Sequence, residues 1–249
     1  MNTRTIATRL RVLACAAVVA ASAGVATAQT DPAATIKSAV EAWLKGRYQV
    51  DGVQPTPLPG IYEVRIGFDL FYVDAKGQYA FVEGQMVDLK TGRSLTKERT
   101  DALLTIDFKE LPLDLAIKQV LGKGTRVVAV FEDPNCGHCR NLRRELLNVR
   151  DVTIYTFPYP ILAADSDVKA RQAWCAADRI KAWNELMLQG RVPGNDGSCE
   201  NPIKQVQELG RRLRVSGTPT LFFANGKRVP GAVPAPQLNQ LIDENSGSS

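Results

Sequence analysis

Hydrophobic and polar positions follow a helical period at the start of the chain and a strand period after it. Apolar side chains recur at helical spacing over residues 31–46, where Asp-Pro opens the segment and Gly ends it. Residues 61–89 instead alternate between apolar and polar, with turn sequences at 75–78 and 90–93. A second helix is predicted over 95–104. Together these elements indicate a small α+β unit with a few antiparallel strands.

The pattern changes after about residue 105. An apolar strand is predicted over 126–131, a helix over 136–149 and a second strand over 152–157. Strand, helix and strand within about thirty residues form a βαβ unit, whose two strands are parallel. The other predicted elements are helices over 167–176, 178–188, 202–213 and 236–243, and strands over 220–223 and 227–229 flanking Asn225-Gly226.

The first 28 residues have the layout of a secretory signal peptide. A short basic segment precedes an apolar run over 12–24, and Ala26-Thr27-Ala28 provides the small-x-small cleavage pattern. The apolar run is shorter than the roughly twenty residues that a membrane anchor needs. It also follows Cys15 for the most part, which argues against lipid attachment at that cysteine. We therefore expect cleavage after Ala28 and an exported chain without a membrane insertion.

Composition and charge exclude several classes of protein. With 45% hydrophobic and 23% charged residues among 249, the chain is an ordinary globular protein, not a disordered or fibrous one. The formal net charge is +5. Arg4, Arg9 and Arg11 lie in the predicted leader, which holds no Asp or Glu, so the remainder carries +2. That charge is too small to indicate nucleic acid as the partner.

The candidate chemistry lies where the strand over 126–131 leads into the next helix. Cys136-Gly137-His138-Cys139 is a CxxC motif at that junction. The unpaired backbone N–H groups of a helix start favour the thiolate of the first cysteine, and the thiolate is the reactive species. His138, the chain's single histidine, adds a nearby donor. Three arginines, at 140, 143 and 144, keep the surroundings positive, although such a stripe is most often a solvated helix face.

The same motif is also half of a metal site, which is the alternative to redox chemistry. A structural zinc needs four ligands, and the two other cysteines of the exported chain lie far away in sequence. The βαβ context favours a redox pair. We expect no metal and no cofactor.

A second motif, residues 216–220 (Ser-Gly-Thr-Pro-Thr), precedes an apolar strand about eighty residues after the CxxC. A proline that leads into a strand is common. The functional alternative is a cis Thr218–Pro219 bond against the CxxC, with the Thr218 backbone N–H and C=O facing outward to pair with an extended substrate. The presence of both motifs favours this second interpretation.

These motifs, with Phe131 to Cys139 and Trp174-Cys175 in the same order, resemble the thioredoxin-like DsbC/DsbG family of periplasmic thiol-disulfide isomerases. The resemblance covers nearly all of 105–245 and is closer to the DsbC branch. It implies a signal peptide over 1–28, a cystatin-like α+β dimerisation domain over 29–94 and a linker helix over 95–110. A thioredoxin-like α/β domain with a helical insertion would then cover 111–249.

The resemblance also implies function. Cys136 would attack the substrate and Cys139 would resolve the mixed disulfide, in a periplasmic homodimer that rearranges incorrect disulfides of exported proteins and is kept reduced by a DsbD-like inner-membrane protein. Thioredoxin carries a buried Asp six residues before its first cysteine, where this chain has Val130, so we expect no buried proton acceptor. Two alternatives stay open: a DsbG-like reductase of sulfenylated cysteines, and chaperone-like binding of unfolded chains.

Cys175 and Cys199 are the remaining cysteines of the exported chain. The family pattern implies that they form a structural disulfide. Two buried free thiols are the alternative, which an oxidising compartment disfavours.

Overall fold

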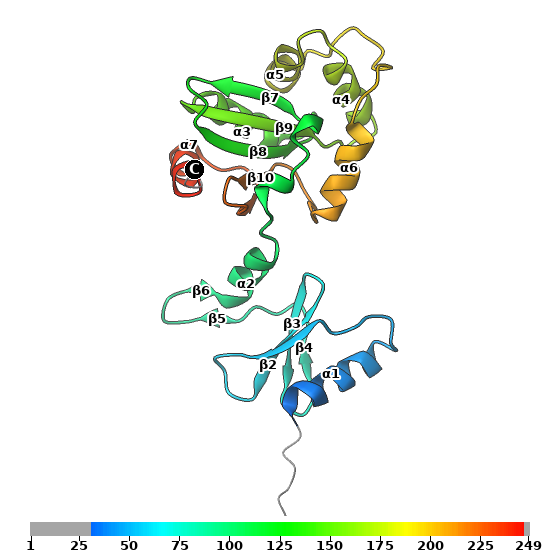
Figure 1. Ribbon diagram of the computed structural model, residues 1–249, viewed down its shortest axis with the longest axis vertical. Helices are drawn as coiled ribbons and strands as arrows, with labels where there is room; N and C mark the ends of the chain where they lie inside the picture. Colours follow the sequence, from blue (N-terminus) through cyan, green and yellow to red (C-terminus); the bar gives the residue numbers. More distant parts are fainter. Residues whose placement is uncertain (1–30, 247–249) are drawn as a thin grey trace, which may run out of the picture.

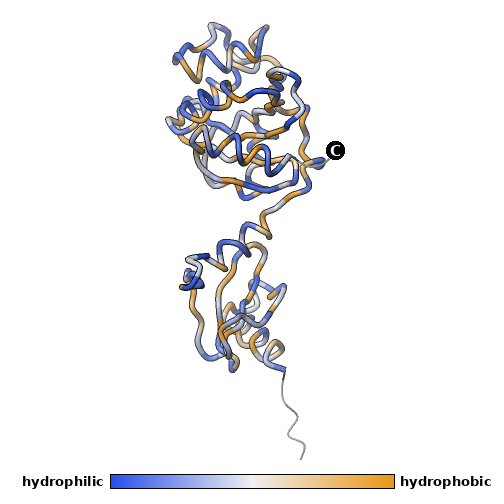
Figure 2. Tube along the Cα trace, turned by 90° about the vertical axis from the view of Figure 1, so that its left-hand side faces the viewer, coloured by the Kyte–Doolittle hydropathy of each residue, from blue (hydrophilic) through white to orange (hydrophobic). Residues whose placement is uncertain are grey.

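The computed structural model describes residues 31–246, which fold into two units joined by one segment of chain (Figure 1). The signal peptide expected over 1–28 lies outside the described residues. In both units, hydrophobic stretches of the chain alternate with hydrophilic ones (Figure 2), as expected where each element buries one face.

The N-terminal unit packs one helix on an antiparallel sheet. Helix α1 (Pro32–Trp43) begins at Asp31, whose side chain accepts a hydrogen bond from the Ala33 backbone N–H at 3.0 Å. The sheet has the order β1-β2-β3-β4, and each neighbouring pair is antiparallel. Its strands are β1 (Gly52–Pro55), β2 (Ile61–Ile66), β3 (Asp69–Asp74) and β4 (Ala80–Phe81).

The core of this unit is small. Ile36 and Val40 of α1 pack against Val64, Phe71 and Val73 of the sheet. A short hairpin of β5 (Val87–Asp88) and β6 (Arg93–Ser94) follows, and then α2 (Leu95–Leu103), the 3-10 turns Phe108–Glu110 and Leu113–Leu115, and the second unit.

The second unit is built on a five-stranded mixed sheet with the order β11-β10-β8-β9-β7. Its strands are β7 (Ile117–Leu121), β8 (Arg126–Glu132), β9 (Val152–Pro158), β10 (Thr220–Phe223) and β11 (Arg228–Pro230). β8 and β9 are parallel and the other neighbours are antiparallel. The βαβ unit predicted from the sequence is therefore confirmed.

Helices cover both faces of this sheet (Figure 1). On one face, α3 (Gly137–Leu147) and α7 (Ala235–Glu244) pack over buried residues of β8, β9 and β10. On the other face, α6 (Ile203–Arg212) covers a second cluster that includes Phe131. Helices α4 (Ser166–Trp174) and α5 (Arg179–Gln189) enclose a third cluster beside the start of α3.

Three strands, β1, β6 and β7, have no counterpart among the sequence predictions. β6 has two residues and overlaps the turn predicted over 90–93, and β1 has four residues and ends on Pro55. β1 is an edge strand, where proline is tolerated because an edge has unpaired positions. β7 is also an edge strand that pairs only with β9, and apolar and polar residues do not alternate along it.

Candidate active site

Cys136 lies at the junction of β8 and α3. It is the N-cap of α3, and its sulfur accepts a hydrogen bond from the Cys139 backbone N–H at 3.2 Å. The sulfur also donates to the Thr218 carbonyl oxygen at 3.3 Å. Cys136 is 3% exposed, so very little of it is open to solvent. This position gives the sulfur the helix-start environment that the sequence predicts, under more cover than a freely exposed thiol would have.

Cys139 lies one turn further along α3 and is fully buried. Both cysteines of the motif are free thiols in this structure. Burial raises the pKa of the Cys139 thiol, and the negative charge of Glu132 raises it further. The Asp133 backbone N–H and the Thr218 hydroxyl act in the opposite direction. The balance keeps Cys139 as a neutral thiol, which makes it a poor nucleophile on its own.

The second motif meets the first. The Thr218–Pro219 bond is cis, and this turn lies directly before β10. The Thr218 carbonyl points to the Cys136 sulfur, whereas the sequence analysis expects it to face outward. Pro219 is buried, and its carbonyl accepts from the Gly231 backbone N–H at 2.8 Å. The turn is therefore held between Cys136 and the residue that follows β11.

The polar residues around the motif divide into exposed and buried ones. His138 is exposed and lines a shallow hollow together with Arg140 and Arg144. Arg143 differs, because it is only 1% exposed and forms an ion pair with Glu132. The expected solvated stripe of three arginines is thus wrong at Arg143, which turns inward because α3 packs that face on the sheet.

Glu132 is the residue that sequence reasoning missed. It is the last residue of β8, is completely buried, and accepts a hydrogen bond from the Trp183 indole N–H at 2.9 Å. The absence of a carboxylate at Val130 predicted that no buried acceptor lies near the cysteines. Side chains two positions apart on a strand share a face, so Glu132 places a carboxylate on the face that Val130 also occupies.

Asp133 holds the loop opposite the motif. Its carboxylate accepts from the backbone N–H groups of Ile161 and Leu162 at 2.7 and 2.9 Å, and from the Ser166 hydroxyl at 2.9 Å. It also accepts from the Asn135 backbone N–H at 2.7 Å. A buried carboxylate with four donors is well satisfied, so Asp133 joins the cysteine turn to the segment that leads into α4.

The other two cysteines lie away from this site. Cys175 and Cys199 form a disulfide with a Cα–Cα distance of 5.7 Å, and it encloses α5 in a loop of sequence separation 24. Trp174, next to Cys175, is buried and stacks under the Arg179 guanidinium at 4.0 Å from the ring centre. This disulfide therefore braces the helical part of the second unit.

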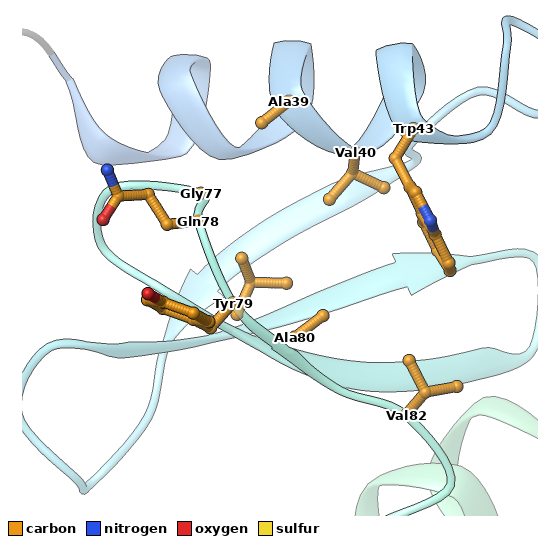
Figure 3. Close-up of a pocket in the computed structure, with 9 residues that line it drawn as sticks. Ala39, Val40, Trp43, Gly77, Gln78, Tyr79, Ala80 and Val82 are labelled. Atoms are coloured by element: carbon orange, nitrogen blue, oxygen red, sulfur yellow. The ribbon is translucent and has the colours of Figure 1, made fainter.

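An apolar hollow marks the N-terminal unit. It has a volume of about 340 Å³ and lies between α1 and the turn from β3 to β4 (Figure 3). Trp43 and Tyr79 at its rim are 62% and 74% exposed. Large apolar side chains gathered on a surface favour contact with another chain.

No group of three or more His, Cys, Asp or Glu side chains in residues 31–246 is arranged to hold a metal ion. Over the same stretch, no helix combines the length and the apolar character that crossing a membrane requires.

Comparison with known protein families places both units. Residues 113–246 match the thioredoxin-like domain, and residues 26–97 match the "Disulfide bond isomerase protein N-terminal domain". The predicted fold class, an α+β N-terminal domain followed by a thioredoxin-like domain, is confirmed by these two matches.

Individual relatives agree with the family matches. The chain is 47% identical over 195 residues to the "Probable thiol:disulfide interchange protein DsbC" of Bordetella pertussis, covering 78% of this chain and 69% of that protein. It is 27% identical over 221 residues to the "Thiol:disulfide interchange protein DsbC" of Escherichia coli K12, covering 87% and 89%. The crystal structure of a disulfide interchange protein from Neisseria gonorrhoeae superposes with a TM-score of 0.54 at 42% identity, over 55% of this chain and all of that one.

Proposed function

The chain belongs to the DsbC family of thiol:disulfide interchange proteins, and from this premise we propose that it rearranges incorrect disulfides in exported proteins through Cys136 and Cys139. The observation that carries the assignment of these residues is the meeting of the CxxC turn with the Thr218–Pro219 turn, 3.3 Å apart at the Cys136 sulfur. Both motifs lie at one end of β8 and β10, which are neighbouring strands.

Cys136 acts as the nucleophile. Its thiolate attacks one sulfur of a substrate disulfide, a bond forms between Cys136 and that sulfur, and the other substrate sulfur leaves as a thiolate. The N-cap position supports this role, because the Cys139 backbone N–H at 3.2 Å stabilises negative charge on the Cys136 sulfur. The first product is a mixed disulfide between enzyme and substrate.

The mixed disulfide can be resolved by two reactions. If a thiol of the substrate attacks its own bridging sulfur, a new substrate disulfide forms, Cys136 leaves, and the reaction is an isomerisation without net electron transfer. If Cys139 attacks the Cys136 sulfur instead, the substrate leaves reduced and the enzyme becomes oxidised. The second route needs an external reductant, for which a DsbD-like inner-membrane protein is the proposed partner.

The Thr218–Pro219 turn is the proposed substrate-binding element. An extended substrate segment that lies along this turn would bring its disulfide next to the Cys136 sulfur. The Thr218 carbonyl then exchanges its contact with the Cys136 thiol for a contact with the substrate backbone. His138, exposed beside Cys136, is proposed to donate to the leaving thiolate.

The test uses a scrambled substrate with several disulfides. In the Cys136→Ala variant the yield of correctly paired substrate should fall to the background of uncatalysed reshuffling. The Cys139→Ala variant should keep part of the isomerase activity and accumulate mixed disulfides, because the escape route is missing. A Cys136→Ala variant with full yield would refute the assignment.

A reductase of sulfenylated cysteines would use the same two residues. In that reaction Cys136 attacks the sulfenic sulfur, hydroxide leaves as water after protonation, and Cys139 then releases the reduced protein. The rates on a scrambled disulfide and on a sulfenylated protein separate the two activities. The N-terminal match to an isomerase domain favours isomerisation.

Chaperone-like binding is a second function that one observation favours. The hollow rimmed by Trp43 and Tyr79 offers apolar surface that an unfolded chain can cover (Figure 3). The Cys136→Ala/Cys139→Ala variant should then suppress aggregation of an unfolded protein as well as the wild type does. Loss of suppression in that variant would tie the effect to thiol chemistry and not to binding.

A periplasmic homodimer is the proposed assembly. The N-terminal domain match supports dimerisation through the first unit, and β4 leaves one edge of its sheet open. The signal peptide predicted over 1–28 and the Cys175–Cys199 disulfide support an oxidising compartment. Sedimentation analysis of the mature chain tests the dimer, and fractionation of cells tests the location.

A further inference from the structure

Glu132 is a buried carboxylate with only one of its two oxygens bonded. Oε2 accepts from the Trp183 indole N–H at 2.9 Å and from the Arg143 guanidinium. Oε1 is equally buried and has no hydrogen-bond partner. Both members of the ion pair are almost completely out of water, at 0% and 1% exposure.

An unbonded carboxylate oxygen in such a place is costly. A buried acceptor without a donor loses its hydration and gains nothing in return, at about 1–3 kcal/mol and more for a charged group. Arg143 balances the charge of Glu132 but does not satisfy Oε1. Oε1 therefore keeps an open acceptor position in a dry environment.

The surroundings of Glu132 place this acceptor beside Cys139. Cys139 and Arg143 lie four residues apart on the buried face of α3, and Arg143 pairs with Glu132. Trp183, the other partner of Glu132, packs in the same apolar cluster as Cys139. The Glu132 charge acts directly on Cys139, since it is one of the causes that raise the pKa of the Cys139 thiol.

The other groups near this sulfur do not compete for its proton. The Asp133 carboxylate already accepts four hydrogen bonds from the 161–166 loop and Asn135. Arg143 on α3 is a cation and has no acceptor atom. Thr156 on β9 and Trp183 on α5 do not titrate, and Cys136 is the sulfur that Cys139 attacks. His138 is exposed, whereas Cys139 is fully buried.

We propose that Glu132 accepts the proton of the Cys139 thiol, directly or through one water molecule, when Cys139 resolves the mixed disulfide. The inference rests on the proposed roles of the two cysteines. The Cys139 sulfur forms a bond to the Cys136 sulfur, the bond from Cys136 to the substrate breaks, and the substrate sulfur leaves with the electron pair. The Cys139 proton passes to Glu132 Oε1 and then to solvent or to the leaving thiolate.

Such a base is needed at this step. Only the thiolate attacks a disulfide, and the Cys139 thiol is held neutral by its burial. A base inside the protein can form the thiolate at neutral pH without waiting for hydroxide. Cys136 does not require this base, because the Cys139 backbone N–H at the helix start donates a hydrogen bond to its sulfur.

The test follows both steps in one trace. Reduced protein is mixed with an aromatic disulfide such as DTNB, and release of the coloured thiol is recorded by stopped flow. The first phase reports attack by Cys136, and the second reports closure by Cys139. Positioned bases contribute about 10²–10⁴-fold, so Glu132→Gln should slow the second phase by at least about fivefold at neutral pH and leave the first phase within about twofold.

Glu132→Gln leaves Arg143 unpaired in the core, so a second variant guards against misfolding. Glu132→Gln/Arg143→Met removes both charges, a replacement that is often tolerated in stability. It should show the same slow second phase. The control is Thr156→Val, which removes the 2.7 Å hydrogen bond from Arg143 and keeps the carboxylate. Its second phase should stay close to the wild type.

The wild type supplies a measurement that needs no variant. With an internal base, the second-phase rate should change little between about pH 6 and pH 8, whereas a thiol that depends on hydroxide loses tenfold per unit. A tenfold fall per unit overturns the proposal. So does a second phase within fivefold of the wild type in the double variant, or an equal slowing in Thr156→Val. Absence of the first phase in the wild type would refute the proposed function instead.

Discussion

The Cys175–Cys199 disulfide gives a stability prediction that can be worked through from the structure. It closes a loop of sequence separation 24 around α5. In the chain-entropy model, a closed loop of about 25 residues restricts the unfolded state by about 3.5 kcal/mol at 25 °C. Replacing both cysteines by serine should therefore lower the free energy of unfolding of the second unit by about that amount.

The expected change in melting temperature follows from the size of this unit. Unfolding entropy is about 2.1 cal/mol/K per residue, so a unit of roughly 140 residues has an unfolding entropy of about 0.3 kcal/mol/K. A loss of about 3.5 kcal/mol then corresponds to a fall in Tm of about 12 °C. Differential scanning calorimetry of the mature chain measures it.

The control variant is Cys136→Ala/Cys139→Ala, which removes the same number of sulfurs without opening a loop. Its Tm should change by less than half of the fall expected for Cys175→Ser/Cys199→Ser. The buried residues of α5, among them Trp183 and Leu186, should keep that helix packed at 25 °C in Cys175→Ser/Cys199→Ser. The rate of Cys136 labelling should therefore equal that of the wild type. If the Tm of Cys175→Ser/Cys199→Ser falls by less than about 5 °C, the loop-entropy argument is refuted.

Three further predictions follow from the contacts of the site. Trp183→Phe keeps an aromatic ring but removes the donor to Glu132. It should lower the free energy of unfolding in urea by about 1.5–3 kcal/mol, the usual value for a hydrogen bond to a charged group. An unchanged denaturation midpoint would contradict this prediction. Asp133→Asn should cost about 2–3 kcal/mol by the same measurement and speed amide exchange at Ile161, since the amide cannot accept from all four donors; slow exchange would contradict it. Burial and the charge of Glu132 raise the pKa of Cys139, so the folded state keeps a proton that the unfolded state releases above about pH 8.5. The reduced protein should thus lose up to about 1.4 kcal/mol of stability per pH unit above that point relative to Cys139→Ser, as measured by denaturation at several pH values.

Local sequence signals were sufficient for the elements that carry the cysteines. β8 is a continuous apolar run and α3 is amphipathic, and a strand that leads directly into a CxxC helix has few other interpretations. The parallel pairing of β8 with β9 follows from the connection through α3, because a helical crossover permits it. β7 could not be found this way, since its sequence does not alternate between apolar and polar residues and its Val120 is exposed.

The burial of Glu132 and Arg143 could not be predicted from the sequence, because each residue taken alone is also typical of an exposed position. Glu132 at the end of an apolar strand looks like the first solvent-facing residue after a core segment. Arg143 looks like one of several arginines on an exposed helix. Each is buried because the other lies opposite to it, and only the packing of α3 on the sheet brings the two together. No periodic sequence pattern predicts an ion pair between a strand and a helix.

The same reasoning explains how one helix start supports two thiols with different behaviour. Cys136 is the N-cap, so its sulfur accepts a hydrogen bond from the Cys139 backbone N–H at the positive end of the helix dipole. Cys139 lies inside the first turn, where the sulfur is surrounded by the core and faces a negative charge from Glu132, which disfavours the thiolate. In the proposed reaction these differences set the order of the steps: Cys136 would react first with the substrate, and Cys139 would act only when its proton is taken. A family member in which the acceptor was lost would then retain isomerisation by substrate thiols and lose the escape through Cys139.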